Sequence, residues 1–94
     1  MGVRENRMLR IQRTSNGETV FTVSGRLEAE NATELLELLA AEGEGRRLAL
    51  DLKDVVLVDR DIVRFLRMCE SDGVTLRNCP PYVRAWIARD AEQP

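Results

Sequence analysis

The stretch LALDLKDVVLVDRDIVRFL, Leu48 to Leu66, decides the fold, because the pattern of a buried strand passes directly into the pattern of a helix. Its first part, Leu48–Val58, is nearly all apolar, which is typical of a strand covered on both faces. From Asp59 to Glu70 the apolar residues recur at helical spacing instead. The apolar positions of this expected helix are Ile62, Phe65, Leu66 and Cys69. A strand followed at once by an amphipathic helix predicts a domain of the α/β class.

Two strands and one helix are expected before this stretch. A first short strand covers Met8 to Gln12, and Ser15-Asn16-Gly17 predicts a tight turn into a second strand, Thr19 to Ser24. Asn31 and Glu34 have the spacing of a capping box, in which each side chain bonds the other residue's backbone N–H. We therefore expect a helix that begins at Asn31.

A short strand and a last helix are expected after it. Val74 to Arg77 has the pattern of a strand, and Pro80-Pro81 introduces a helix. The inward positions of that helix are Val83, Trp86 and Ile87. The order β-β-α-β-α-β-α predicts a mixed four-stranded sheet with about three helices packed mainly on one face. Residues 8–90 form a single domain in this prediction, and residues 1–7 and 91–94 form flexible termini.

Composition and charge exclude several classes of function. A chain of 94 residues has room for one modest core. Its 14 basic and 16 acidic residues give a net charge of −2, which supplies no general attraction to nucleic acid or to an anionic membrane. No apolar run approaches the roughly 20 residues of a membrane span, and Met1 to Ile11 lacks the apolar core of a signal peptide. We expect a cytoplasmic protein with no nucleic-acid partner and no direct membrane insertion.

Catalysis is also disfavoured. The chain has no histidine, and so lacks the commonest general base and the commonest metal ligand. Asp59 and Asp61 are two residues apart at a helix start, where their side chains diverge, and no nucleophile or phosphate-binding glycine loop accompanies them. Arg60 between them disfavours a metal ion. We expect no enzyme activity, no metal site and no cofactor, and we expect Cys69 and Cys79 to be buried free thiols.

Five phrases in order resemble the STAS domain family, named for sulfate transporters and anti-sigma-factor antagonists. The phrases are Phe21–Leu27, Leu48–Leu52, Val55–Asp59, Gly73–Asn78 and the Val83, Trp86, Ile87 group. Together they span roughly Met8 to Arg89, nearly the whole chain. The resemblance implies the same mixed sheet with helices on one face. It also implies a non-catalytic protein-interaction domain, similar to an anti-sigma-factor antagonist in bacterial partner-switching signalling.

The signature helix departs from the family at its start. Family antagonists carry Asp-Ser-Ser/Thr-Gly-Leu there, and a partner kinase phosphorylates the second hydroxyl residue. Here Asp59 matches the aspartate, while Arg60 and Asp61 replace both hydroxyls. Asp61 therefore occupies the family's phosphoacceptor position and cannot be phosphorylated in the usual way. Its single charge imitates a phosphate only in part, and the alternative is that Asp59 and Asp61 simply cap the helix.

The resemblance also implies a docking edge. Arg60, Arg64 and Arg67 follow one side of the signature helix, which family antagonists present to their kinases, and arginine can pair bidentately with a partner's carboxylate. The alternative is a solvated face on which the arginines pair with Asp61 and Glu70 of the same helix. The expected partner-binding residues are Asp59, Arg60, Asp61, Arg64 and Arg67.

The resemblance leaves the partner open. An anti-sigma-factor-type kinase is the leading expectation. Some standalone STAS proteins resemble accessory subunits of ABC-type lipid transporters, so a transporter ATPase subunit is the second. A nucleotide- or lipid-sensing module is the third expectation, and a homodimer is compatible with each of the three.

Overall fold

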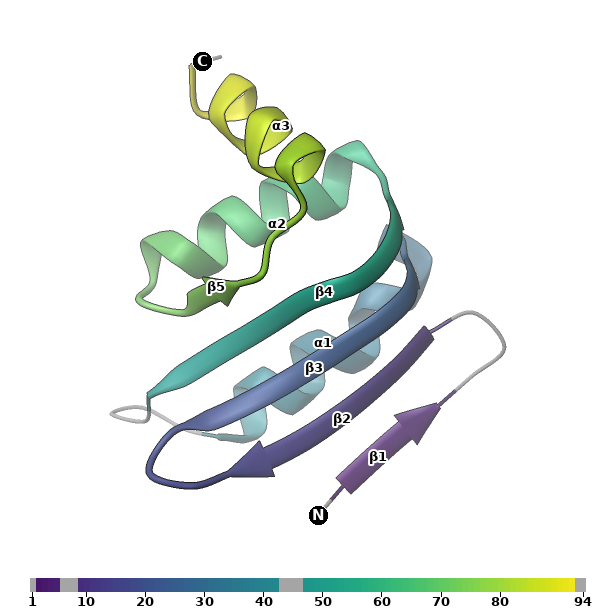
Figure 1. Ribbon diagram of the computed structural model, residues 1–94, viewed down its shortest axis with the longest axis vertical. Helices are drawn as coiled ribbons and strands as arrows, with labels where there is room; N and C mark the ends of the chain where they lie inside the picture. Colours follow the sequence, from purple (N-terminus) through teal and green to yellow (C-terminus); the bar gives the residue numbers. More distant parts are fainter. Residues whose placement is uncertain (1, 6–8, 43–46, 93–94) are drawn as a thin grey trace.

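The computed structural model describes residues 2–5, 9–42 and 47–92 (Figure 1). The elements follow in the order β1 Gly2–Glu5, β2 Leu9–Ser15, β3 Thr19–Leu27, α1 Ala29–Ala41, β4 Leu48–Val58, α2 Arg60–Ser71, β5 Thr75–Arg77 and α3 Pro81–Glu92. The predicted mixed α/β class and the predicted order β-β-α-β-α-β-α are confirmed from β2 to α3. β1 precedes that order and adds a fifth strand.

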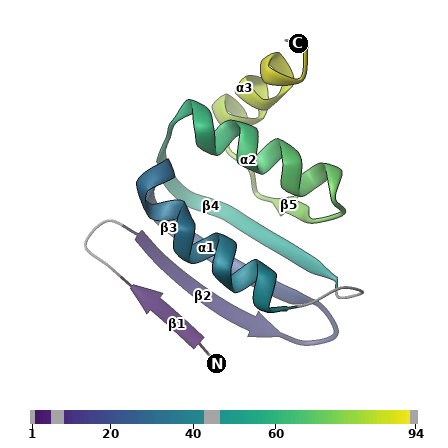
Figure 2. The ribbon, with the colours of Figure 1, turned by 180° about the vertical axis from the view of Figure 1, so that it is seen from behind.

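The five strands form one sheet in sequence order, β1-β2-β3-β4-β5. β1, β2 and β3 are antiparallel neighbours, and Gly17 in the turn between β2 and β3 adopts φ +79°, which favours glycine. β3, β4 and β5 are parallel, because α1 and α2 return the chain to the same edge before each new strand. In Figure 2 both helices lie on one face of the sheet, as predicted.

The two ends of the chain differ from the prediction. The segment placed in a flexible N-terminus includes β1, which pairs with β2 from Gly2 opposite Arg13 to Glu5 opposite Arg10. This pairing satisfies backbone groups that an edge strand β2 would otherwise leave open. Met8, the expected start of the first strand, lies outside the described residues. At the other end, α3 continues to Glu92, two residues beyond the predicted end of the domain.

The core lies between the sheet and the two helices α1 and α2. In β2 and β3 the buried residues alternate, as in Ile11, Phe21 and Val23. In β4 they are spaced irregularly, at Leu50, Leu52, Val55 and Val58. The pairing of β3 with β4 shifts register twice, and each shift adds one residue to β4. These irregularities keep all four side chains on the core face.

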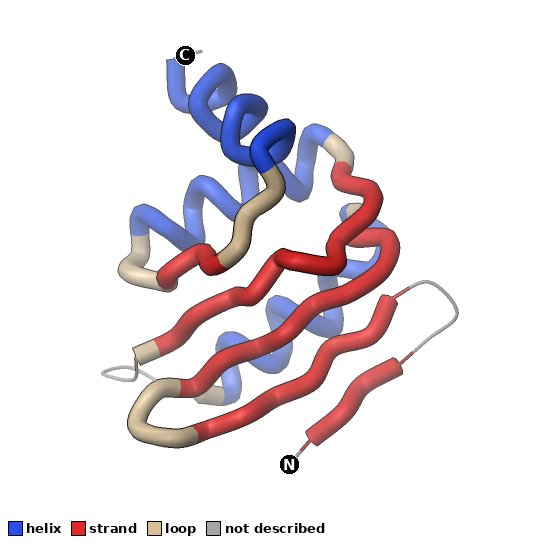
Figure 3. Tube along the Cα trace, in the orientation of Figure 1, coloured by secondary structure: helices blue, strands red, loops and turns tan. Residues whose placement is uncertain are grey.

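Within the described residues, no helix covers the other face of the sheet (Figure 3). The prediction that the Leu48–Val58 strand is covered on both faces is therefore wrong: Lys53 and Val56 are exposed, and Asp51 is half-buried. The strand is rich in apolar residues because its two register shifts bring successive residues toward the core, and not because a second layer packs on it. α3 lies beyond the sheet, against α2 (Figures 1 and 3).

Candidate functional site

Asp59 lies at the start of two helices. Leu27 and Val58 pair as the last residues of the parallel strands β3 and β4, so both strands release the chain at the same edge of the sheet. Asp59 Oδ1 accepts a hydrogen bond of 2.9 Å from Ile62 N–H in α2, and Oδ2 accepts one of 3.0 Å from Ala29 N–H in α1. One carboxylate therefore caps both helix N-termini, where backbone N–H groups lack partners within the helix.

This arrangement corrects the expected capping box. α1 begins at Ala29, two residues before the predicted start, and the backbone carbonyl of Glu28 accepts hydrogen bonds from Asn31 and Ala32. The Asn31 side chain donates to the carbonyl of Arg26 at 2.8 Å and does not cap the helix. The cap comes from Asp59, thirty residues later in the chain. The sequence around Asn31 could not show this cap, because Asp59 follows a different strand, β4.

Asp61 lies on the exposed first turn of α2. It is in helical register with Phe65 and Met68, and so it points to the side of α2 that faces α1. Within the described residues its carboxylate has no ion pair. Asp59 and Asp61 therefore have different environments: the first carboxylate holds the fold, and the second is available to a partner.

The arginine stripe of α2 meets α3. Arg67 Nε donates to Asp90 Oδ2 at 2.7 Å, and Arg64 Nε lies 3.9 Å from Asp90 Oδ1. Asp90 is only 7% exposed, so this ion pair joins α2 to α3 at the edge of the core. Glu70 instead accepts two hydrogen bonds from Arg84 of α3. The alternative in which Arg64 and Arg67 pair with Asp61 and Glu70 is therefore wrong, because the partner is on another helix.

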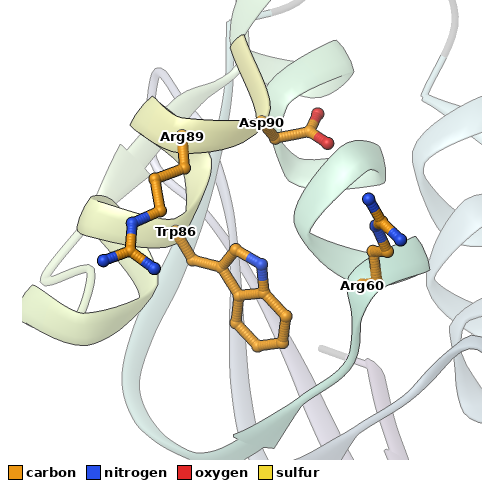
Figure 4. A pocket seen from close by; sticks show the side chains of 4 residues that line it. All are labelled: Arg60, Trp86, Arg89 and Asp90. Carbon is orange, nitrogen blue, oxygen red and sulfur yellow. The ribbon is translucent and has the colours of Figure 1, made fainter. Parts of the chain in front are cut away.

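A hollow of about 290 Å³ lies between the start of α2 and α3 (Figure 4). It is lined by Arg60, Trp86, Arg89 and Asp90. In Figure 4 the indole of Trp86 lies between Arg60 on one side and Arg89 on the other. The basic stripe thus contributes Arg60 to this hollow, while Arg64 and Arg67 contact the Asp90 carboxylate behind it.

Trp86 was expected to point inward, and it does not. It is 37% exposed, while Val83, Ile87 and Asp90 form the buried side of α3 at spacings of four and three residues. Tyr82, Trp86 and Arg89 repeat the same spacing one position earlier, and they line a second hollow of about 350 Å³ together with Ala85. The prediction failed because a large aromatic residue was assigned to the core by its type. The i, i+4, i+7 spacing from Tyr82 was the signal that could have shown an exposed aromatic stripe.

The two cysteines are free thiols, as predicted, but the prediction that both are buried is wrong for Cys79. Cys69 is buried and Cys79 is half-buried. Burial raises the pKa of the Cys69 thiol to about 11, since the thiolate would lose its hydration, and nearby Asp72 adds to this effect. Burial also raises the pKa of the Cys79 thiol. Both groups are therefore protonated thiols at neutral pH, which is the unreactive form.

A scan against protein-family models found no match, and neither did a search of curated proteins. In the described ranges, no helix is both long and apolar enough to span a bilayer. The same residues contain no cluster of three or more potential metal ligands.

Proposed function

We propose that this chain is a non-catalytic protein-interaction domain that docks a partner on the surface formed by the start of α2 and the outer side of α3. The resemblance to STAS anti-sigma-factor antagonists makes an anti-sigma-factor-type kinase the first candidate partner. The observation that carries the proposal is Trp86, exposed in a hollow between two arginines.

The residue types at this surface support protein binding. Tyrosine, tryptophan and arginine are the residues that contribute most to binding energy at protein interfaces. Tyr82, Trp86 and Arg89 follow one side of α3, and Arg60 faces them from α2. An aromatic side chain between guanidinium groups can bury apolar area and also bind a carboxylate bidentately.

The local charge indicates an acidic partner segment. Arg64 and Arg67 both contact the single carboxylate of Asp90, and Arg60 and Arg89 line the hollow beside it. With two guanidinium groups at the Asp90 carboxylate and two more lining the hollow, this surface is positive on a chain whose net charge is −2. We therefore propose that the partner presents an acidic side chain, flanked by apolar ones, to Trp86 and Arg89.

Native co-purification tests this proposal. The tagged wild-type chain should retain an anti-sigma-factor-type kinase that mass spectrometry identifies. Trp86→Ala and Arg89→Glu should lose this partner, while Val56→Ala should keep it, because Val56 is 68% exposed on β4 and does not line the hollow. A transporter ATPase in place of the kinase, or retained nucleotide or lipid in native mass spectrometry, would contradict the kinase proposal and support one of the alternatives.

The proposal also includes a lost phosphorylation switch. Because Asp61 has no hydroxyl, incubation with the isolated kinase and ATP should leave the intact mass unchanged. An added phosphate would contradict this expectation and would place a new acceptor on another residue. Ser71 and Thr75 are exposed hydroxyl residues at the end of α2 and in β5, so peptide mapping should examine them first.

A further inference from the structure

A third hollow, here called the groove, lies on the opposite side of α2, between α1 and α2. This groove has a volume of about 360 Å³, and its walls are apolar. Leu36 and Ala40 line it from α1, and Phe65 and Met68 line it from α2. Leu48, the first residue of β4, and Val74, the residue before β5, also line it. Leu36 is 49% exposed and Met68 is 58% exposed, which is unusual for large apolar side chains next to a core.

The groove exists because the two helices diverge. The carboxylate of Asp59 holds the N-termini of α1 and α2 together. From that point the helices separate toward their C-terminal ends, as Figure 2 shows. The space between them opens beside Leu36 and Met68, where the described residues provide no further layer. A long apolar element about as wide as an α-helix fits between the two diverging helices.

The charges around the groove are mainly acidic. Asp61 lies on the groove side of α2, in helical register with Phe65 and Met68, and Asp72, the residue that follows α2, lines the groove. α1 carries no basic residue, and its glutamates at positions 30, 34 and 37 lie on a different side of the helix from the lining residues Leu36 and Ala40. One basic residue, Arg47, precedes the lining residue Leu48 at the far end of the groove. The arginine stripe of α2 contacts α3 on the other side of the helix.

We propose that this groove binds a cationic amphipathic helix of a partner protein. The apolar side of that helix would cover Leu36 and Met68, and its lysines or arginines would pair with Asp61 and Asp72. Methionine suits such a surface because its flexible side chain adapts to the partner's shape. The site is independent of the α2–α3 surface, since it uses the opposite side of α2 and attracts the opposite charge.

Synthetic peptides test the groove directly. The probe is an amphipathic leucine–lysine peptide of about 18 residues, long enough to form several helical turns. In amide NMR spectra of the full chain it should shift the signals of Leu36, Ala40 and Met68 in a saturable manner. Leu36→Lys should weaken this binding about tenfold or more. The matched control, Val56→Lys, places the same charge on an exposed apolar position outside the groove and should bind as the wild type does.

Two control peptides can overturn the proposal. A leucine–glutamate peptide of the same pattern, and a leucine–lysine peptide with a scrambled pattern, should bind much more weakly; equal binding by either contradicts it. Signals that move at Trp86 instead of Leu36 also contradict it. Two measurements without peptide complete the test. The first is binding of the chain to vesicles of phosphatidylglycerol and phosphatidylcholine, and the second is self-association of the chain, measured by sedimentation velocity. Vesicle binding or self-association that Leu36→Lys abolishes would assign the groove to a membrane or a second copy instead.

Discussion

Asp59 accepts hydrogen bonds from Ile62 in α2 and from Ala29 in α1, and so one side chain joins two helix starts to one sheet edge. Its place as N-cap of α2 could be predicted from the sequence, because an aspartate three residues before Ile62 fits the local rule for caps. Its bond to Ala29 could not be predicted, because that contact depends on the parallel pairing of β3 with β4. The same carboxylate is also one of the five residues that the sequence predicts to bind a partner.

Replacing Asp59 should therefore be costly. Asp59→Ala removes one cap from each helix, and at about 0.5–2 kcal/mol for each cap the free energy of unfolding should fall by roughly 1–4 kcal/mol. Asp61→Ala is the matched control, because it removes an exposed carboxylate without an ion pair and should cost less than about 0.5 kcal/mol. Urea unfolding followed by circular dichroism measures both values. Equal losses in the two variants would show that the double cap adds no stability.

The two phenylalanines differ in environment more than their sequence patterns indicate. Phe21 is fully buried in β3, whereas Phe65 is half-buried and lines the groove between α1 and α2. The helical pattern placed Phe65 on the apolar side of α2 but could not show that α1 diverges from it. We expect Phe21→Ala to cost about 3–5 kcal/mol and Phe65→Ala to cost clearly less. Chemical denaturation compares the two, and a larger loss for Phe65→Ala would contradict the open groove.

At the scale of elements, α3 is the part that the sequence describes least well. Its existence, its start at the two prolines and its buried Val83 and Ile87 follow from local pattern. Its orientation does not, because it depends on Asp90 meeting Arg64 and Arg67 of α2. In this arrangement Trp86 is 37% exposed and lines the α2–α3 hollow, which the local pattern of α3 could not show.

The contact between α2 and α3 should depend on Asp90 more than on Glu70. Asp90 is nearly buried and binds Arg67 at 2.7 Å, so its replacement by alanine should cost about 1–3 kcal/mol. Glu70 and Arg84 form an exposed pair, and Glu70→Ala should cost less than about 1 kcal/mol. Thermal unfolding of the two variants makes the comparison. If Glu70→Ala is the more damaging change, Asp90 does not hold α3 in place.

At the scale of the whole molecule, the order of elements and the one-sided packing could be predicted from hydrophobic period and turn residues. The edge strand β1 and the uncovered second face of β4 could not, because both depend on pairing with distant residues. The same holds for the distribution of charge. The sequence shows a net charge of −2, but only the fold separates a basic aromatic surface at α2–α3 from an acidic apolar groove at α1–α2.

The most direct test of the proposed function is the affinity of the purified anti-sigma-factor-type kinase for the wild-type chain and for three variants, measured by isothermal titration calorimetry. Trp86→Ala and Arg89→Glu should each weaken binding by about tenfold or more, as expected for residues that dominate an interface. Val56→Ala should bind as the wild type does, and circular dichroism should show that every variant is folded. Wild-type affinity in folded Trp86→Ala and Arg89→Glu would contradict docking at the α2–α3 surface.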